Sequence, residues 1–111
     1  MKVLLVLVAL EPLMYREIFA LYLRHHRPQI AVVLISSEAL EEEVRHTKPM
    51  LLIADEVPKT VREMMACWVA VHNGQQLNAD IGAYETFNTV YDVSMQDLTA
   101  IVDKAAAQEA V

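Results

Sequence analysis

The sequence predicts a three-layer α/β sandwich, with parallel strands in the first half of the chain and a β-hairpin in place of part of the second half. Three apolar runs of strand length, residues 3–8, 30–35 and 50–54, alternate with helical patterns. Strands and helices that alternate through short links form right-handed crossovers and a parallel sheet. A fourth run, residues 68–72, is followed at once by Asn73-Gly74, a dipeptide that favours a two-residue hairpin turn.

The first helix is predicted to begin at Pro12 and to end at Arg27-Pro28. Proline suits the first turn of a helix, and it disfavours helical geometry in the residue before it. Residues at the i, i+3 and i+4 spacing are expected to face the sheet: Tyr15, Ile18, Phe19, Tyr22 and His26.

The same helix carries more apolar side chains than one buried stripe needs. It is apolar almost all round between Ile18 and Leu23, so Leu21, and Met14 with it, are left over once the stripe is buried. A surplus apolar patch usually marks an interface, and a two-fold homodimer is the commonest solution. We therefore expect self-association through Met14 and Leu21.

Two shorter helices are expected between the strands. Ser36 or Ser37 can cap an acidic helix over residues 38–46, because a serine hydroxyl accepts a hydrogen bond from a free backbone N–H of the first turn. Thr60 and Glu63 match the capping-box spacing and predict the start of a second short helix.

The second half of the chain is expected to finish the sheet and to close with a helix. Leu77, Ala79 and Ile81 alternate with polar residues, as in a half-exposed strand that follows a hairpin turn. Residues 88–93 are expected to form one more strand. Ser94 is followed three residues later by an aspartate, which predicts a helix start there.

Length, charge and cysteine content limit the class of protein. The 111 residues are enough for one domain, spanning residues 1–111. A net charge of −6 argues against nucleic acid or an anionic membrane as a partner. The single cysteine, Cys67, cannot form an internal disulfide, which favours the reducing cytoplasm. Cys67 is expected to be a core thiol, since no basic neighbour is apparent that could activate it.

The amino-terminal residues are not expected to be a targeting or membrane segment. The apolar run that follows Lys2 stops at Glu11-Pro12 and lacks a small-residue cleavage site. Charged residues such as Glu17 and Arg24 interrupt every stretch that could approach the roughly 20 apolar residues of a membrane helix. The sequence therefore predicts a soluble, cytoplasmic protein.

Residues 2–58 resemble the receiver domain of response regulators. At residues 8–13 the chain reads Val-Ala-Leu-Glu-Pro-Leu, where receivers read roughly V-D-D-E-P-L, and Arg16 stands at the place of a receiver arginine. Residues 49–55, Pro-Met-Leu-Leu-Ile-Ala-Asp, are similar to the third receiver strand, P-D-L-V-L-L-D. The resemblance implies a flavodoxin-like, receiver-like order of strands.

The resemblance also locates the phosphorylation chemistry that a receiver carries out. It places the phosphoacceptor at Asp55, or at Ala54 when the alignment is anchored on Pro58. Phosphoryl transfer to an aspartate needs Mg²⁺, which prefers oxygen ligands in octahedral geometry. Ala9 and Leu10 replace the acidic pair that would bind this ion, and Glu11 is the one carboxylate nearby.

Two further receiver positions are also changed. The fourth strand of a receiver ends in a serine or threonine that holds the phosphate, and His72-Asn73 stand there instead. A lysine–proline pair belongs on the last strand, and this chain has Thr89, Val90 and Tyr91 in that region.

These departures favour a pseudo-receiver that works without phosphorylation, as a protein–protein interaction or dimerisation module in signalling or regulation. Its expected partner is a second copy or another signalling protein, and no enzymatic activity, metal or cofactor is expected. One alternative is an atypical phosphoreceiver that uses Asp55, with Glu11 as a single metal carboxylate. Another is a small enzyme with a site near His72, Asp80 and Glu85.

Nucleotide chemistry has little support in this sequence. The two glycines, Gly74 and Gly82, do not lie between a strand and a helix, which excludes a Walker loop and a dinucleotide fingerprint. The residues after the first strand, Ala9 to Glu11, lack the small and hydroxyl side chains that a flavin phosphate site needs.

Overall fold

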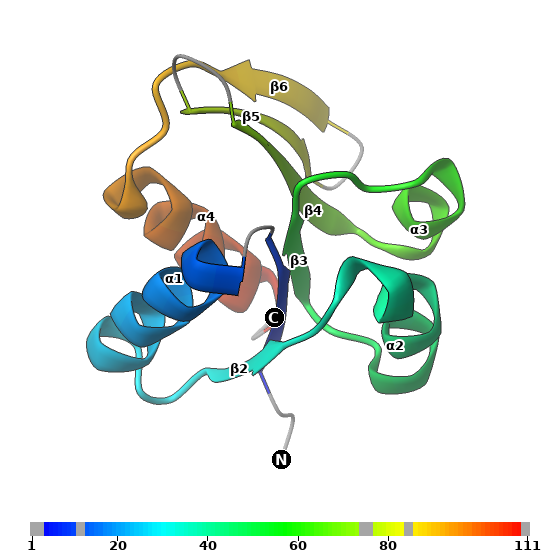
Figure 1. Ribbon diagram of the computed structural model, residues 1–111, viewed down its shortest axis with the longest axis horizontal. Coiled ribbons are helices and arrows are strands. Elements are labelled where there is room, and N and C mark those ends of the chain that lie inside the picture. Colours follow the sequence, from blue (N-terminus) through cyan, green and yellow to red (C-terminus); the bar gives the residue numbers. More distant parts are fainter. Residues whose placement is uncertain (1–3, 11–12, 74–76, 84–85, 110–111) are drawn as a thin grey trace.

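The computed structural model describes residues 4–10, 13–73, 77–83 and 86–109, and within this part the protein is a mixed sheet between two layers of helices. Figure 1 shows α1 and α4 on one side of the sheet and α2 and α3 on the other. The predicted α/β class with three layers is confirmed.

The sheet has six strands in the order β2-β1-β3-β4-β5-β6. The first four strands of this order are mutually parallel, and the last two pair antiparallel with their neighbours. The predicted sequence of parallel strands followed by a hairpin is therefore confirmed. The strands are β1 Leu5–Ala9, β2 Ala31–Leu34, β3 Leu51–Ala54, β4 Cys67–Asn73, β5 Leu77–Ala83 and β6 Thr86–Val90.

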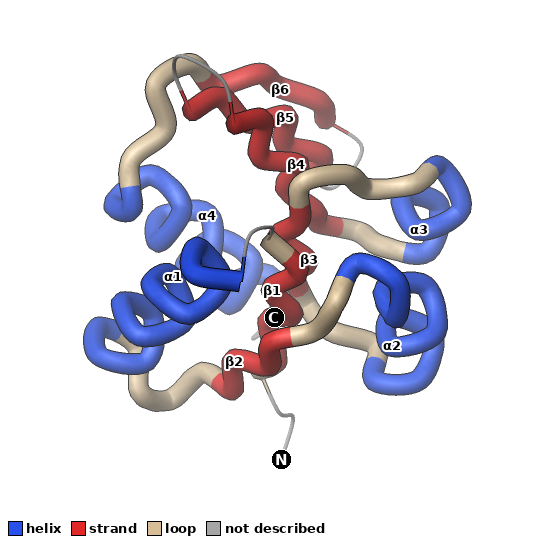
Figure 2. The backbone as a smooth tube through the Cα atoms, in the orientation of Figure 1, coloured by secondary structure: helices blue, strands red, loops and turns tan. Residues whose placement is uncertain are grey.

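Helices lie on both sides of the sheet (Figure 2). The buried apolar side chains form a separate cluster on each face. The helices are α1 Leu13–His26, α2 Leu40–Thr47 with the 3₁₀ turn η1 Ser37–Ala39 before it, α3 Lys59–Met64 and α4 Met95–Glu109. Residues 6–9 of β1 and all of β3 are fully buried, because helices cover both faces of the central strands. This two-sided cover explains why these strands are continuous apolar runs in the sequence.

The inward face of α1 differs from the predicted one. Among residues 16–26 of α1, whose side chains the structure describes, Phe19 is buried as expected, but the other buried residues are Ala20 and Leu23, whereas Ile18 is 47% exposed. A helix that is apolar almost all round has no single stripe to identify from spacing, and packing against the sheet selects the face. The prediction of Ile18 as an inward residue was wrong.

Two of the three predicted side-chain caps are absent from the structure. Ser36 precedes the 3₁₀ turn without a side-chain cap bond, and Ala39 precedes α2. The α3 helix starts at Lys59 after Pro58, so Thr60 lies inside it and does not cap it. Pro58 fixes the entry into this helix through its backbone carbonyl, which accepts hydrogen bonds from the Val61 and Arg62 N–H groups.

The third cap, at α4, is confirmed. The Ser94 Oγ accepts a hydrogen bond from the Asp97 N–H at 3.1 Å, and Asp97 Oδ2 accepts one from the Ser94 N–H at 2.9 Å. This reciprocal pair is a capping box and satisfies two backbone donors at the helix start.

The hairpin and the last strand are displaced from their predicted positions. Asn73 still belongs to β4 and pairs with Leu77, so residues 74–76 connect the two strands, one residue more than in the predicted turn. The predicted turn itself falls on Gly74, outside the described residues. The last strand covers Thr86–Val90, whereas residues 88–93 were expected.

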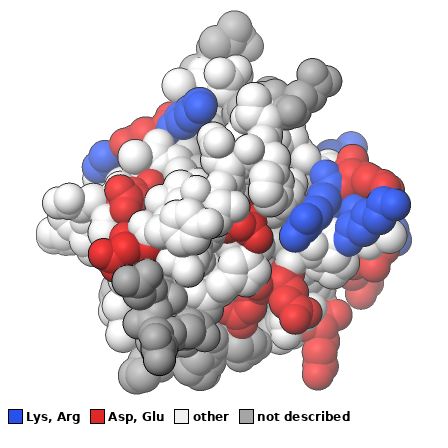
Figure 3. Space-filling view, turned by 90° about the horizontal axis from the view of Figure 1, so that it is seen from above, with Lys and Arg blue, Asp and Glu red and all other residues white. Residues whose placement is uncertain are grey.

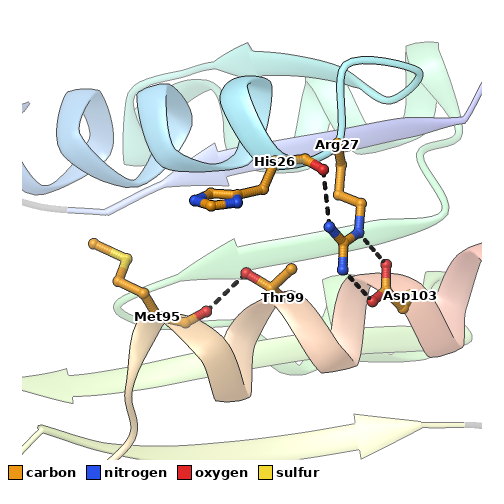
Figure 4. Close-up of polar contacts among 5 residues, drawn as sticks. All are labelled: His26, Arg27, Met95, Thr99 and Asp103. Atoms are coloured by element: carbon orange, nitrogen blue, oxygen red, sulfur yellow. Dashed lines mark hydrogen bonds and ion pairs between the residues drawn. The ribbon is translucent and has the colours of Figure 1, made fainter.

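A bidentate ion pair joins the end of α1 to the middle of α4 (Figure 4). Arg27, just after α1, donates from Nε and Nη2 to the two carboxylate oxygens of Asp103 at 2.7 and 2.8 Å. Its Nη1 also donates to the His26 carbonyl at 2.8 Å. Two parallel hydrogen bonds fix the geometry of a guanidinium–carboxylate pair, so this contact sets the position of α4 along α1.

In the part of the chain that the structure describes, no helix is both long enough and apolar enough to cross a membrane.

Candidate functional site

The carboxyl ends of the parallel strands meet at one edge of the sheet, the usual place for a ligand in an open α/β fold. The register places Ala9 of β1 beside Ala54 of β3, and Ala54 beside Ala70 of β4. Asp55 follows β3 directly at this edge. The structure therefore brings together Ala9 and the end of β3.

Apolar side chains at this edge are part of the protein core. Ala9 is fully buried in the cluster under α2 and α3, and Leu10 is only 6% exposed and belongs to the cluster under α1 and α4. The side chains at the two places of the receiver's acidic pair thus pack on opposite faces of the sheet. Neither offers an oxygen to a cation.

Asp55 is half-buried at this edge, and the neighbouring Glu56 is exposed. Glu11, the carboxylate that the alternative phosphoreceiver would use with Asp55, lies outside the described residues. Arg16, which stands at the place of a receiver arginine, is half-buried and donates from Nη1 to the Ile35 carbonyl at 2.7 Å. This bond ties α1 to the segment that follows β2.

A second polar group lies on the hairpin, beside the carboxyl end of β4. His72 Nε2 and Asp80 Oδ2 are 2.8 Å apart, and Thr89 donates to Asp80 Oδ1 at 2.9 Å. His72 is paired with Asn78 in the register, so Asp80 is its diagonal neighbour on the same face of the hairpin. The structure brings together His72 and Asp80, while Glu85 lies outside the described residues.

The electrostatics of this His72–Asp80–Thr89 group favour an ionised carboxylate. The hydrogen bond with His72 and the one from Thr89 hold the pKa of Asp80 below its ordinary value of 3.8. The His72 side chain is 52% exposed, so part of its ring is accessible to solvent. An imidazole oriented by a carboxylate is an arrangement that can accept a proton.

Trp68 is at the centre of a third feature on the same face of the sheet. The Arg62 guanidinium lies 4.2 Å from the centroid of the Trp68 ring, and the Phe87 ring centroid lies 6.0 Å from it. Arg62 Nε also donates to the Val57 carbonyl at 2.9 Å. A Cβ on Gly82 would overlap the Trp68 indole, so this glycine allows the ring to lie against β5.

These side chains line a surface hollow of about 610 Å³ between α3 and the β5–β6 end of the sheet. Trp68 is buried below it, whereas Phe87 is 59% exposed at its rim. This feature was not predicted from the sequence, because the pairing of Trp68 with Gly82 and the approach of Arg62 to Trp68 depend on the register of β5 and the position of α3.

The structure describes one of the two side chains that were predicted to form the interface on α1. Leu21 is 66% exposed, as expected for a side chain left over from the buried stripe. Ile18, one turn before it, is also exposed and enlarges the apolar surface. The Met14 side chain lies outside the described residues.

Cys67 is buried at the start of β4, and burial raises the pKa of its thiol to about 11. A thiol with this pKa is protonated at neutral pH and is a poor nucleophile. Among the described side chains, no group of three or more His, Cys, Asp and Glu residues is placed to hold a metal ion.

Comparison with models of known protein families, with curated protein sequences and with solved structures gives no match to this chain.

Proposed function

We propose that this protein is a pseudo-receiver, a receiver-like domain that acts as a protein–protein interaction or dimerisation module in signalling or regulation without being phosphorylated. The observation that carries the proposal is the burial of Ala9 and Leu10 at the carboxyl edge of the parallel strands. Mg²⁺ binding there would require hard oxygen ligands, and these two positions supply core packing instead.

The order of the first four strands supports the receiver-like part of the proposal. Strands β2, β1, β3 and β4 follow one another in parallel, which is the start of the flavodoxin-like order. The fifth strand departs from that order, because β5 runs antiparallel to β4. The strand beside β4 in the sheet therefore belongs to a hairpin. A receiver would have a parallel strand that carries a lysine at this place.

Exposed apolar side chains support the interaction part of the proposal. Leu21 and Ile18 form a surface on α1, and it faces away from the sheet that the helix covers. Contiguous exposed apolar side chains can mark an interaction surface. We propose that this α1 surface takes part in self-association or contacts another signalling protein.

The test of the proposal is treatment with a small-molecule phosphodonor. The protein is incubated with Mg²⁺ and acetyl phosphate, and its intact mass is measured, with a phosphorylatable receiver domain in the same tube as the positive control. The expected result is an unchanged mass. An added phosphoryl group that disappears in the Asp55→Asn variant would contradict the proposal and establish the atypical phosphoreceiver.

The α1 surface is tested by the molar mass of the protein in solution, measured by light scattering after size exclusion. Leu21→Glu is expected to lower the molar mass of any assembly held by α1. Thr60→Glu adds the same charge to an exposed position of α3, on the opposite side of the sheet, and is the matched control. Equal molar masses for both variants and the wild type would exclude the α1 surface.

A small enzyme is the second candidate, favoured by the 2.8 Å contact of His72 with Asp80. The reaction class that fits is hydrolysis with His72 as general base. It is tested with an activated ester: hydrolysis above the buffer rate that is lost in both His72→Gln and Asp80→Asn would establish it. A rate equal to that of the buffer would exclude His72 from such chemistry.

A further inference from the structure

The last strand of the sheet, β6, has an open edge. Within the described residues β6 pairs with β5 alone, and it lies at the end of the strand order. Residues 86–89 are exposed, and Val90 is half-buried. Figure 1 shows that β5 and β6 extend beyond the helices that cover the other strands.

This edge lacks the features that usually keep sheet edges from pairing. Natural edge strands carry charged residues, proline or β-bulges. The sequence of β6, Thr-Phe-Asn-Thr-Val, has no charge and no proline. Its register with β5 runs without interruption from Thr86 opposite Ala83 to Val90 opposite Ala79, so no bulge bends it away. Threonine, phenylalanine and valine are also residues that favour strands.

An open edge accepts a specific kind of partner. Its outward N–H and C=O groups alternate along the strand, and an extended backbone can pair with all of them. The charge of the protein restricts the partner further. With a net charge of −6, two copies repel each other, and contact between them is least unfavourable where the touching surfaces carry no like charges. Figure 3 views the molecule from the end that carries β5 and β6 and shows mainly uncharged side chains there, with acidic side chains among and around them.

We propose that β6 pairs antiparallel with β6 of a second copy, about a two-fold axis that passes through Asn88. This inference rests on the proposed function as an interaction module and names its partner and its surface. A two-fold axis relates identical surfaces and makes the paired strands antiparallel. It places Asn88 opposite its own copy, Phe87 opposite Thr89, and Thr86 opposite Val90.

The pairing is self-complementary at each of these positions. Phe87 and Thr89 lie on the same face of β6, so each exposed Phe87 ring gains a β-branched side chain of the other copy as its neighbour. No like charges meet across the axis. A five-residue strand pair is a small interface compared with the roughly 1,200–2,000 Å² of stable complexes. The dimer is therefore expected to dissociate on dilution.

The first test is a series of protein concentrations in the analytical ultracentrifuge. Asn88→Lys places two lysines opposite each other at the axis and should raise the dimer dissociation constant by about tenfold or more. Asn88→Thr is the matched control, which keeps the position uncharged and should leave the constant close to that of the wild type. Circular dichroism checks that both variants keep the fold.

The second test is a disulfide cross-link that can form only if residue 88 of the two copies lies at the two-fold axis. Asn88→Cys brings two thiols to directly opposite positions, where Cβ atoms of paired strands approach closely enough for a disulfide. Mild oxidation should yield a covalent dimer. Leu21→Cys should not cross-link under the same conditions, and Cys67 is buried and does not compete.

The combined results show whether β6 or α1 forms the dimer interface. A dimer that is weakened by Asn88→Lys and trapped through Asn88→Cys supports the β6 pairing, whether or not Leu21→Glu also weakens it. A dimer that is lost in Leu21→Glu and kept in Asn88→Lys overturns it and assigns self-association to α1. A wild type that is monomeric at every concentration also overturns it. The absence of phosphorylation is measured separately, so failure of the β6 pairing does not decide the proposed function.

Discussion

Leu10 is a core residue at the position where, in the receiver resemblance, an aspartate would bind the metal. An aspartate at this place in a receiver is a ligand of the metal, and it needs water and a cation around it. Leu10 is buried among apolar side chains below α1 and α4. A carboxylate in that environment would lose its hydration without gaining a partner of opposite charge. An acidic residue at this position is therefore expected to lower the stability of the protein.

The first prediction follows from this burial. Leu10→Asp should lower the free energy of unfolding by about 3 kcal/mol or more, because it removes a buried leucine and adds a charge to the core. Leu21→Asp makes the same chemical change at an exposed position and should have an effect within about 0.5 kcal/mol. Urea unfolding measures both. Equal effects of the two substitutions would show that Leu10 is not a core residue.

Residues differ in how far the sequence could predict their roles. The exposure of Leu21 could be predicted, since it was surplus to any single stripe. The contact of His72 with Asp80 could be proposed from their proximity in a hairpin. The Thr89 bond to Asp80 and the Trp68–Arg62 contact could not, because they depend on the register of β6 and on the position of α3.

At the scale of elements, different hydrogen bonds satisfy the backbone N–H groups in the first turns of the helices. The α4 helix has a full capping box between Ser94 and Asp97. The 3₁₀ turn before α2 has Ser36 at the same position but no side-chain cap bond, and its Ala39 N–H bonds the Ser36 carbonyl instead. The two places also differ in sequence, because Asp97 follows Ser94 by three residues whereas Ala39 stands three residues after Ser36.

The second prediction separates these two serines. Ser94→Ala should destabilise the protein by about 1 kcal/mol, since it removes the acceptor for the Asp97 N–H. Ser36→Ala is the matched control and should be near neutral, because no cap bond is lost. Thermal unfolding of the two variants gives the comparison. A larger effect at Ser36 than at Ser94 would contradict the assignment of the caps.

The third prediction concerns the pair that joins α1 to α4. The hydrogen bond from Arg27 lowers the pKa of Asp103 below its ordinary value of 3.8. A carboxyl whose pKa is lower in the folded state stabilises the fold above its unfolded pKa, and this contribution is lost as the pH falls through its folded pKa. Asp103→Asn should therefore lower the Tm at neutral pH, and the difference from wild type should shrink below about pH 3.8.

Glu41→Gln serves as the control for that pH series. It breaks the exposed pair of Glu41 with Arg45, which lies within α2 and joins no second element. Exposed pairs of this kind contribute little to stability, so its effect on the Tm should be the smaller of the two. A gap between wild type and Asp103→Asn that stays constant from neutral to acidic pH would contradict the role given to Arg27.

The arrangement of elements could be predicted further than their exact faces and ends. Apolar runs without alternation identified the strands that helices cover on both sides, and Asn73-Gly74 identified the antiparallel return. The inward face of α1 could not be predicted, because apolar residues surround that helix. The end of β6 was misplaced by three residues, since Tyr91 and Val93 continue a strand-like composition after Val90.

At the scale of the whole molecule, the hairpin changes what the sheet can do. In a fully parallel sheet a crossover helix would cover the strand after β4 on one face. Here β5 returns directly beside β4, and β6 ends the sheet with an open edge. The same change moves the polar group of His72, Asp80 and Thr89 onto the hairpin. The carboxyl ends of β1 and β3 carry Ala9, Leu10 and Asp55.

The account depends most on the absence of a cation site at this edge. The direct measurement is an NMR titration with Mn²⁺, which broadens the amide signals of residues close to a bound ion. The account predicts no selective broadening at Ala9, Leu10, Ala54 and Asp55 at concentrations that saturate a phosphorylatable receiver. Broadening that is centred on Ala9 and Asp55 and reversed by excess Mg²⁺ would contradict it.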